Sequence, residues 1–512
     1  MGTNITTKDK IYLLADLIAE IAKLKSQGKV IVQTHGVFDL LHPGIIRHLT
    51  SAKKQGDILV VTIIRDKDVR RGSGRPIFPE NFRVESVASI NQVDFACIVD
   101  DEEPFECVNQ IKPDIFAKGQ AYKERDRQIH RKIFEEEKEF YFGKTKISET
   151  DGFTISSSQL LQQFVNLLPE DTREYLRSIF KKFSYQHILK SLHELNSQKV
   201  LVIGDGIIDE YHYCEPMGKA SKANLVVNKY LAHEVFAGGA FAIANHVASI
   251  CGRVDIISLL GEEDSREEFI KDNLKPNINS KFFTRSDGPT VIKKRYLHKY
   301  LNQKLFEVNF INDKFIEEPL ADEIKDHLEE VIPEYDLVLL SDFGHGFINN
   351  SIYSTMEKKS RFLAINTQTN AANTGYNMIT KYRNADFICL DETELRLAAQ
   401  EKFRNIDSIA RYIREQVNAK NLIVTLGKRG SLAVNSKNEI FRAPIFSTNV
   451  VDTIGAGDAF FSYVAPSVAH GMPLNLVSFI GNVVGALAVQ IMGNKRSVEK
   501  FEVLELIHTL SK

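Results

Sequence analysis

The feature that most constrains the fold is a repeated alternation of short β-branched runs with amphipathic helical segments. One series begins at Val30-Ile31-Val32 and continues through the strand-like runs 58–64 and 95–99. A second series begins at 200–203. Its later strand-like runs lie at 255–260, 337–340, 362–365, 387–390 and 422–425. Strands that alternate with helices form parallel sheets, so the sequence predicts two α/β units.

The domain boundaries follow from length and pattern. A chain of 512 residues is long enough for two or three domains. Residues 159–198 are charged, have a helical pattern and carry no strand signal, which indicates a helical linker. We therefore expect a first domain over 1–158, the linker over 159–198 and a second domain over 199–512.

Composition excludes several kinds of partner. The net charge is −2, so no basic surface is indicated for nucleic acid or for an anionic membrane. The five cysteines are far apart and form no CxxC pair, so we expect neither a disulfide framework nor a zinc site. No run reaches the roughly 18 consecutive apolar residues that a membrane helix needs. We expect a cytoplasmic protein whose partners are small molecules.

The segment from Thr34 to Gly44 follows the first strand and leads into a helix. A glycine-bearing turn at a helix N-terminus offers backbone N–H groups and the positive end of the helix dipole, which suits phosphate. His42 can add a hydrogen-bond donor, although a histidine taken alone is more often satisfied by the local backbone. The segment resembles the HxGH-type nucleotidyltransferases, in the branch that holds the heptose adenylyltransferases and the glycerol-phosphate cytidylyltransferases.

This resemblance covers roughly 28–165 and implies a Rossmann-like domain that uses CTP or ATP, with His42 as a catalytic residue. The implied nucleotide-binding residues are Thr34, His35, Gly36, Phe38, Asp39, Gly44, Lys53, Arg75, Lys118, Gly119, Ser156, Ser157 and Ser158.

One residue departs from the HxGH pattern, because Ile45 stands where the second histidine belongs. The loss of one transition-state donor costs on the order of 3 kcal/mol, or about two decades of rate, so we expect an impaired transferase. His48, one turn further along, and His35 are the residues that could partly substitute. The alternative is a first domain that senses nucleotide or assists assembly without catalysis, and Ile45 favours it.

The segment 451–461 carries the most specific motif of the chain, Asp452-Thr453-Ile454-Gly455-Ala456-Gly457-Asp458. Its glycines let the backbone approach an anion at a helix start, and Asp458 lies where a carboxylate can take the proton of an attacking hydroxyl. Phosphoryl transfer needs that combination. The motif resembles the DTxGAGD hallmark of the ribokinase/PfkB-type carbohydrate kinases, and the resemblance covers roughly 199–510.

The kinase resemblance implies Mg²⁺ and ATP, together with a set of site residues. The implied catalytic residues are Gly455, Ala456, Gly457 and Asp458. The implied nucleotide-binding residues are Thr425, Gly427, Gly430, Asp452 and Thr453. The implied substrate-binding residues are Asp205, Asp209, Gly238, Gly239, Asn245, Lys293, Asp342 and Asn366. Asp391, where the family usually has asparagine, and Glu394 are the implied metal ligands.

Three departures from the heptose kinases all lie on the acceptor side. The asparagine that usually follows the glycine pair falls at Ala242 or Ile243, and Asn245 lies slightly too far along. A Ser-Pro-Glu-Ala-Pro tract becomes 221–225. An Asp-Pro-Lys segment becomes the neutral, amide-rich run 366–370. The acceptor need not be a heptose 7-phosphate, and the loss of the lysine weakens the case for a second phosphate on it.

Taken together, these patterns predict a sugar kinase fused to a nucleotidyltransferase that makes a nucleotide-activated sugar, in the reverse of the domain order of the heptose enzymes. A regulated kinase with a non-catalytic first domain remains open. A pseudoenzyme scaffold is opposed by the complete 452–458 motif. By analogy with ribokinase-like folds that pair through their lid strands, we expect a homo-oligomer, most simply a dimer.

Overall fold

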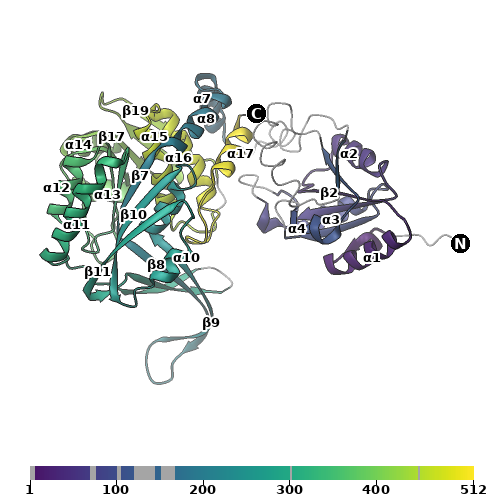
Figure 1. The fold of residues 1–512 in the computed structure, drawn as a ribbon, viewed down its shortest axis with the longest axis horizontal. Helices are drawn as coiled ribbons and strands as arrows, with labels where there is room; N and C mark the ends of the chain where they lie inside the picture. Colours follow the sequence, from purple (N-terminus) through teal and green to yellow (C-terminus); the bar gives the residue numbers. More distant parts are fainter. Residues whose placement is uncertain are drawn as a thin grey trace. The chain divides into compact units, whose positions relative to one another are not determined.

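The computed structural model describes residues 6–69, 76–100, 105–119, 145–150, 168–299, 303–447 and 450–511. The chain divides after residue 169 into two compact units (Figure 1). Each unit is an α/β structure, as the alternation predicts, and each is described below by itself. Among the described helices, none combines the length and the apolar character needed to cross a bilayer.

The first unit is built on a six-stranded parallel sheet in the order β1-β4-β3-β2-β5-β6. Its strands are β1 (Ile11–Tyr12), β2 (Ile31–Gly36), β3 (Ile58–Ile64), β4 (Phe95–Val99), β5 (Ile115–Gly119) and β6 (Lys146–Thr150). Its helices include α1 (Leu14–Ser26), α2 (Pro43–Lys53), α3 (Glu80–Ala88) and α4 (Phe105–Ile111). The predicted runs 58–64 and 95–99 coincide with β3 and β4.

Two hydrophobic cores flank this sheet. Helices α2 and α3 pack on one face through residues such as Leu49 and Val87, and α1 and α4 pack on the other through Leu17 and Val108. The strand order reverses beside β2, which has β3 on one side and β5 on the other. In a doubly wound sheet, ligands bind outside the carboxyl ends of the strands at such a switch point. The loop that follows β2 is therefore placed to hold a ligand.

The second unit is built on a nine-stranded sheet in the order β11-β10-β7-β14-β15-β16-β17-β18-β19. Only the pairs made by β18 and β19 are antiparallel. The strands are β7 (Lys199–Gly204), β10 (Arg253–Glu263), β11 (Ile278–Pro289), β14 (Leu337–Asp342), β15 (Leu363–Thr367), β16 (Ala385–Asp391), β17 (Ala419–Thr425), β18 (Ser431–Val434) and β19 (Ile440–Ala443). Every strand predicted from 200 onward is present.

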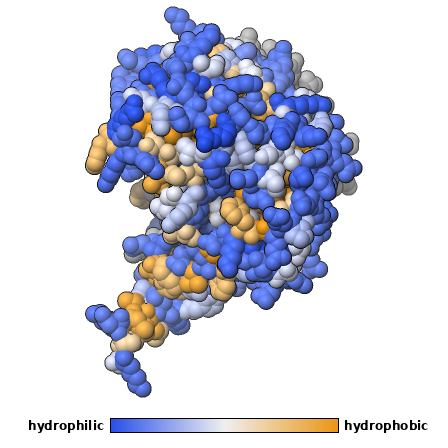
Figure 2. Space-filling view, turned by 90° about the vertical axis from the view of Figure 1, so that its left-hand side faces the viewer, coloured by the Kyte–Doolittle hydropathy of each residue, from blue (hydrophilic) through white to orange (hydrophobic). Residues whose placement is uncertain are grey.

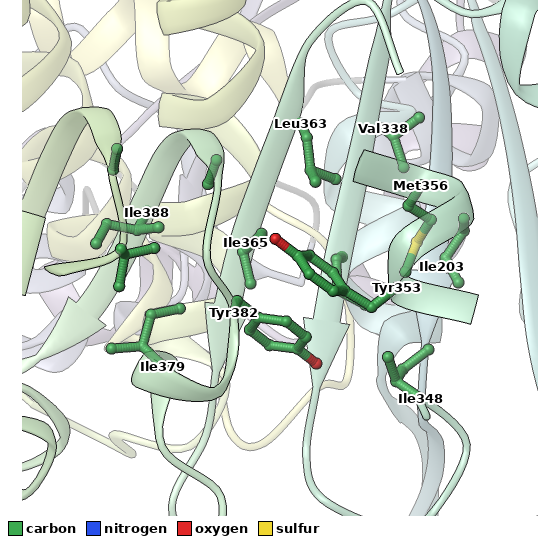
Figure 3. Close-up of a cluster of buried hydrophobic side chains, with 14 of the residues drawn as sticks. Ile203, Val338, Ile348, Tyr353, Met356, Leu363, Ile365, Ile379, Tyr382 and Ile388 are labelled. Carbon is green, nitrogen blue, oxygen red and sulfur yellow. The ribbon is translucent and has the colours of Figure 1, made fainter. Parts of the chain in front are cut away.

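Helices cover both faces of the nine-stranded sheet. They are α9 (Ala240–Val247), α10 (Glu267–Asp272), α11 (Glu318–Val331), α12 (Asn350–Lys359), α13 (Glu392–Ala399), α14 (Ile406–Gln416), α15 (Ala456–Ala469), α16 (Leu474–Ala488) and α17 (Lys500–Leu510). Helices α11 to α14 bury one face. There Tyr353 and Tyr382 lie with ring centroids 4.6 Å apart, among aliphatic side chains such as Ile365 and Ile388 (Figure 3). Helices α9 and α15 lie against the sheet from outside that core.

The predicted linker is largely part of the second unit. Helices α7 (Glu170–Lys182) and α8 (Tyr185–Glu194) belong to the compact body 170–511. Phe180 of α7 packs edge-on against Phe479 of α16 at 5.5 Å, and Leu176 and Ile188 are buried. The amphipathic pattern that suggested a linker instead supplies an apolar face that the second unit buries. The second unit therefore begins near residue 168.

A second, four-stranded sheet in the order β13-β12-β8-β9 was not predicted, and we call it the outer sheet. It comprises β8 (Gly206–Lys219), β9 (Val226–Gly239), β12 (Ile292–His298) and β13 (Lys304–Phe310). The hairpin of β8 and β9 projects from the unit in Figure 1. Apolar side chains gather along this projection in Figure 2, and Met217, Val226 and Phe306 are about half exposed or more.

Candidate active sites

The kinase motif forms a helix start at the carboxyl edge of the nine-stranded sheet. Gly455 is the N-cap of α15 with φ +79°, a left-handed conformation that favours glycine, and no side chain of the described residues caps this helix. A Cβ atom at Gly455 would collide with the side chain of Asn494. The first turn, which includes Ala456 and Gly457, therefore presents its backbone N–H groups as an anion site.

Asp458 lies in this first turn and is 7% exposed. The side-chain amide of Gln368 donates a hydrogen bond to its Oδ1 atom. Burial raises the pKa of Asp458 to about 7, with a further increase from Asp209 and an opposing effect of Lys293. A carboxyl group with a pKa near neutrality suits a general base at physiological pH.

The outer sheet brings charged side chains to this base. Asp209 on β8 forms an ion pair with Arg295 on β12, and Asn494 donates to its Oδ2 atom at 3.1 Å. Lys293 is the register partner of Asp209, and its ammonium lies 5.8 Å from the ring centroid of Phe343. Because strand side chains alternate between faces, Lys293 and Arg295 lie on one face of β12. Burial lowers the pKa of Lys293.

Two of the predicted substrate-binding aspartates form hydrogen bonds within the second unit. Asp205 accepts from the backbone N–H groups of Phe343 at 2.9 Å and His345 at 3.4 Å. Asp342 accepts from Tyr382 Oη at 2.7 Å and pairs with Lys381. Burial, with a further effect of Asp342, raises the pKa of Asp205 to about 7. Their bonds fix the loop 342–345, and their role in substrate binding stays a prediction.

Asn245 also forms hydrogen bonds within the protein. It donates to Asn273 O at 2.8 Å and accepts from Lys275 N at 2.9 Å, so it holds the segment after α10, and its contact with an acceptor stays a prediction. A cavity of about 700 Å³ lies here, and its lining includes Ala242, Asn245 and Asn494. Since Asn494 also touches Asp209, the cavity adjoins the acceptor side of the site.

The glycine pair and Asn366 have structural roles beside the site. A Cβ atom at Gly238 would collide with the carboxylate of Asp209, and Gly239 has φ +57°. The pair therefore allows Asp209 its close approach. Asn366 donates to Cys389 O at 2.9 Å, while its buried Oδ1 atom has no hydrogen-bond partner among the described residues.

The predicted nucleotide-binding turn follows β17, where Thr425 ends the strand. Gly427 and Gly430 both have positive φ, and a Cβ atom at Gly430 would collide with the backbone of β19. Leu426 N donates to Gly430 O at 2.7 Å and closes the turn. This turn and the start of α15 both lie at the carboxyl edge of the nine-stranded sheet. Ligands of such sheets bind at that edge, so the two together suit a nucleotide site.

Asp452 is placed differently from the prediction. Its carboxylate accepts from Tyr211 Oη at 2.7 Å, from Lys304 Nζ at 2.9 Å and from Gly493 N at 3.0 Å. These partners come from the outer sheet and from the chain before α17, so Asp452 ties the outer sheet to the motif. The carbonyl oxygen of Thr453 accepts from Ala456 N at 3.4 Å.

Asp391 and Glu394 form a reciprocal cap at the start of α13. Each side chain accepts from the backbone N–H of the other, and Glu394 also accepts from Thr369 N at 3.1 Å. Burial, followed by the charge of Asp391, raises the pKa of Glu394 to about 8. Within the described ranges no three acidic, histidine or cysteine side chains gather as a ready metal cage. The pair fits Mg²⁺, which is held by one or two carboxylates together with water and nucleotide phosphates.

In the first unit, the loop after β2 ends at the N-terminus of α2. His42 is the N-cap, and its Nδ1 atom accepts from Gly44 N at 3.2 Å. Burial lowers the pKa of His42. Phe38 has φ +52°, and Gly36 ends the strand. His42 and Gly44 thus lie at the switch point of the sheet, as the resemblance implies.

The side chains of three other predicted nucleotide-binding residues, Thr34 and His35 of β2 and Asp39 of the loop, form hydrogen bonds within the first unit. Thr34 Oγ1 lies 2.8 Å from His48 Nε2, and His35 Nδ1 lies 3.0 Å from Thr62 Oγ1. Asp39 accepts from the backbone N–H groups of 77 and 78 at 2.7 and 3.0 Å. Burial lowers the pKa of His48 to about 4. Each of these side chains has a partner inside the fold, and their role as nucleotide ligands stays a prediction.

Lys53 lies away from the other predicted nucleotide-binding residues. It ends α2 at the opposite edge of the sheet from His42 and pairs with Asp94, which precedes β4. It therefore cannot join the predicted site. Ile45 is partly buried against the core beneath α2. Gly119 ends β5. Arg75, the Lys118 side chain and Ser156, Ser157 and Ser158 lie outside the described residues.

The sequence did not identify Arg295, Gln368 or Asn494 as site residues. The spacing of Arg295 two positions after Lys293 is a signal that could have found it, because both lie on one face of a strand. Gln368 and Asn494 approach the site only through the folding of distant segments. No local pattern distinguishes them from other polar residues.

Comparison with known proteins supports both units. Residues 197–500 match the pfkB family carbohydrate kinases, and residues 34–163 match the cytidylyltransferase-like family. The bifunctional protein HldE of Vibrio atlanticus is 27% identical over 321 residues, or 62% of this chain and 65% of the relative. HldE of a Nitratiruptor species is 26% identical over 298 residues, or 58% and 62%. The matches thus span less than two thirds of these relatives.

Solved structures show the fold of the second unit. Phosphofructokinase-2 from Escherichia coli in complex with substrates and products has a TM-score of 0.51 at 15% identity. The same enzyme in complex with fructose-6-phosphate has a TM-score of 0.50 at 14% identity. Each comparison covers 62% of this chain and all of the solved chain. The predicted ribokinase-like fold is confirmed. The chain therefore belongs to the pfkB family of carbohydrate kinases and carries a cytidylyltransferase-like domain at its N-terminal side.

Proposed function

We propose that this protein is a bifunctional enzyme of nucleotide-activated sugar synthesis. Its second unit phosphorylates a sugar hydroxyl with Mg-ATP, and its first unit joins the resulting sugar phosphate to a nucleoside monophosphate from CTP or ATP. The observation that carries the kinase step is the buried Asp458 carboxylate at the start of α15, where the charges of Asp209 and Lys293 from the outer sheet act on it.

In the kinase step, Asp458 accepts the proton of the attacking hydroxyl. The backbone N–H groups of Gly455 to Gly457 stabilise negative charge on the phosphoryl group that is transferred. Asp391 and Glu394 would hold Mg²⁺ through water, and the ion would neutralise the nucleotide phosphates. The turn 427–430 would receive the nucleotide.

The acceptor lies between the base and the outer sheet. Asp209 is placed to accept from sugar hydroxyls, while Lys293 and Arg295 are placed to donate to hydroxyls or to a negatively charged substituent. The heptose enzymes that this chain resembles imply transfer to the anomeric hydroxyl. The product would be a sugar 1-phosphate, the form that a nucleotidyltransferase consumes.

In the transferase step, the sugar phosphate attacks the α-phosphate of the second nucleotide, and pyrophosphate leaves. The start of α2 and His42 would hold the nucleotide phosphates. The partial burial of Ile45 and the internal bonds of Asp39 and His35 favour a second candidate. In that case, the first unit binds nucleotide without catalysis and leaves a regulated kinase.

The outer sheet supports the expected homodimer. Phe306, Val308 and Phe310 alternate along the edge strand β13 and are 41–49% exposed. On a single copy this apolar row would face water, which is unusual for a monomer. A second copy of the chain could cover it. Size-exclusion chromatography with light scattering should show a dimer for the wild type and a monomer for Phe306→Glu.

One experiment tests the assignment of both activities. The purified protein is incubated with a panel of sugars and sugar phosphates, with ATP or CTP, and products are identified by mass spectrometry. A phosphorylated sugar that is then converted to a nucleotide sugar supports the bifunctional enzyme. A phosphorylated sugar with no pyrophosphate release supports the regulated kinase. No phosphorylated product with any sugar contradicts the proposal.

A further inference from the structure

The amide-rich run 366–370 reaches the catalytic centre, and the kinase step as described so far assigns it no chemical role. Gln368 follows β15, and its side-chain Nε2 atom donates to Asp458 Oδ1. Its own backbone is fixed as well. Gln368 N donates to Asp342 O at 2.9 Å, and Gln368 O accepts from Asn377 Nδ2 at 3.1 Å. The side chain therefore extends to the carboxylate from an anchored backbone.

Three asparagines hold this segment against the loop after β14, and we call them the amide frame. Asn370 and Asn373 both donate to Phe343 O, at 2.9 and 2.7 Å, and Asn377 donates to Asp342 O at 3.0 Å. These bonds join two stretches that follow neighbouring parallel strands. The frame explains why this part of the chain is rich in neutral amides, because each one satisfies backbone carbonyl groups at the sheet edge.

The Gln368 amide donates to Asp458 without adding a charge, and other charged groups already act on this carboxylate. Asp209 on β8 places negative charge near Asp458, and Lys293 on β12 places positive charge near it. Glu394 on α13, whose pKa burial raises to about 8, also interacts with Asp458 electrostatically. The carboxylate has two oxygen atoms. Because Gln368 donates to Oδ1, Oδ2 is the atom that remains for the proton of the acceptor hydroxyl.

We propose that Gln368 is the positioning residue of the catalytic base, and this inference rests on the proposed kinase function. Its amide fixes the rotation of the Asp458 carboxylate so that Oδ2 faces the acceptor. In the reaction the hydroxyl proton passes to Oδ2 and the hydroxyl oxygen bonds to the γ-phosphorus. The bond from the γ-phosphorus to the bridging oxygen breaks, and ADP leaves. A lysine, which the heptose kinases have in this segment, would add a positive charge that an amide does not.

The first test compares Gln368→Met, a substitution of similar shape without the donor, with Gln416→Met at the exposed end of α14. Loss of a hydrogen bond to a charged group predicts that kcat falls about 10- to 100-fold while the KM for ATP stays within about twofold. The control variant should keep wild-type kcat. An unchanged kcat in Gln368→Met, with wild-type protein active, would overturn the inference.

The second test uses Gln368→Glu, which keeps the shape and makes the donor titratable. A protonated glutamic acid can still donate to Oδ1, whereas an ionised one repels the carboxylate. The activity of this variant relative to wild type should therefore rise as the pH falls from about 8.5 to about 6. A purely structural role of Gln368 predicts a constant ratio, and that result would contradict the positioning role.

A third measurement separates this inference from the kinase proposal, because it needs no sugar. Thermal unfolding at pH 8 is recorded for Gln368→Met, Asp458→Asn and the double variant. If Gln368 stabilises the ionised carboxylate, the Tm loss caused by Gln368→Met should be clearly smaller in the Asp458→Asn background. Additive shifts would overturn the inference. Non-additive shifts in a protein with no kinase activity would refute the proposed function alone.

Discussion

The two units share an architecture and differ in how they treat the charged groups at the sheet edge. In the second unit, burial raises the pKa values of Asp458 to about 7 and of Glu394 to about 8. In the first unit, burial lowers the pKa of His42 and lowers that of His48 to about 4. Perturbed pKa values cluster at functional sites, although structural networks of hydrogen bonds and ion pairs also produce them. The carboxyl edge of the nine-stranded sheet holds Asp458 and Glu394, two acids with raised pKa values. At the corresponding edge of the first unit, the described side chains of His35 and Asp39 bond to the protein itself.

The largest expected effect tests the kinase side of this contrast. Asp458→Asn keeps the shape of the side chain but cannot accept a proton. We expect kcat with the active sugar to fall at least about 100-fold, as for the loss of a general base. ATP affinity, measured by calorimetry, should remain close to that of wild type.

The exposed Asp326 on α11 offers a matched control. Asp326→Asn should leave kcat unchanged. If Asp458→Asn retains more than a tenth of the wild-type rate, Asp458 is not the base and the contrast between the two edges loses its main support.

The next effect sharpens the transferase side. Ile45 lies in the first turn of α2, where its backbone N–H donates to His42 O at 2.9 Å. Ile45→His restores the donor that the HxGH pattern has at this position. Pyrophosphate release with CTP or ATP and the sugar phosphate should rise by about one to two decades.

The variant Ile46→His, on the exposed neighbouring position, should not change that rate. If neither the wild type nor Ile45→His releases pyrophosphate with any kinase product, the first unit is a non-catalytic nucleotide-binding module.

Local patterns predicted the two sheets well, because hydrophobic periodicity reports directly on burial in a parallel sheet. The runs 58–64 and 95–99 became β3 and β4 residue for residue. The outer sheet was not predicted, because one of its faces carries ionic residues such as Asp209 and Arg295 and so lacks the hydrophobic pattern of a buried strand. Its pairing with distant segments also leaves no local signal. The helices α7 and α8 were found, but only the packed structure shows that they belong to the second unit.

The site was predicted less evenly. The motif 452–458 formed the expected helix start, since its glycines require that backbone. Side chains were harder to place, because an aspartate such as Asp39 or Asp205 can bind a ligand or hold a loop with the same sequence around it. Lys53 shows a further limit, since a helix carries its last turn to the opposite edge of the sheet from its first.

A smaller effect is expected on stability. An acid whose pKa is raised on folding, such as Asp458, opposes folding increasingly as the pH rises from about 4 towards its folded value near 7. Asp458→Asn removes this opposition. The variant should therefore be more stable than wild type by a few kcal/mol at pH 8, and the gain should shrink at pH 5.

Chemical unfolding of both proteins at the two pH values measures this difference, with Asp326→Asn as the control that should show no such trend. A gain of equal size at pH 5 and pH 8 would show that the carboxyl group is not held at a free-energy cost.

The smallest effect concerns how the two units work together. Each is compact, and α7 and α8 are packed into the second, so a cut before residue 168 should leave both intact. The sugar phosphate would then diffuse between separate proteins, since no flexible arm is needed to carry it. Fragments 1–167 and 168–512, when mixed, should make the nucleotide sugar at nearly the intact rate once the intermediate has accumulated. A fragment that begins at 190 should unfold at lower temperature, because it loses the buried Leu176 and Ile188. A mixed rate far below that of the intact chain, with each fragment folded and active alone, would show that the units depend on one another.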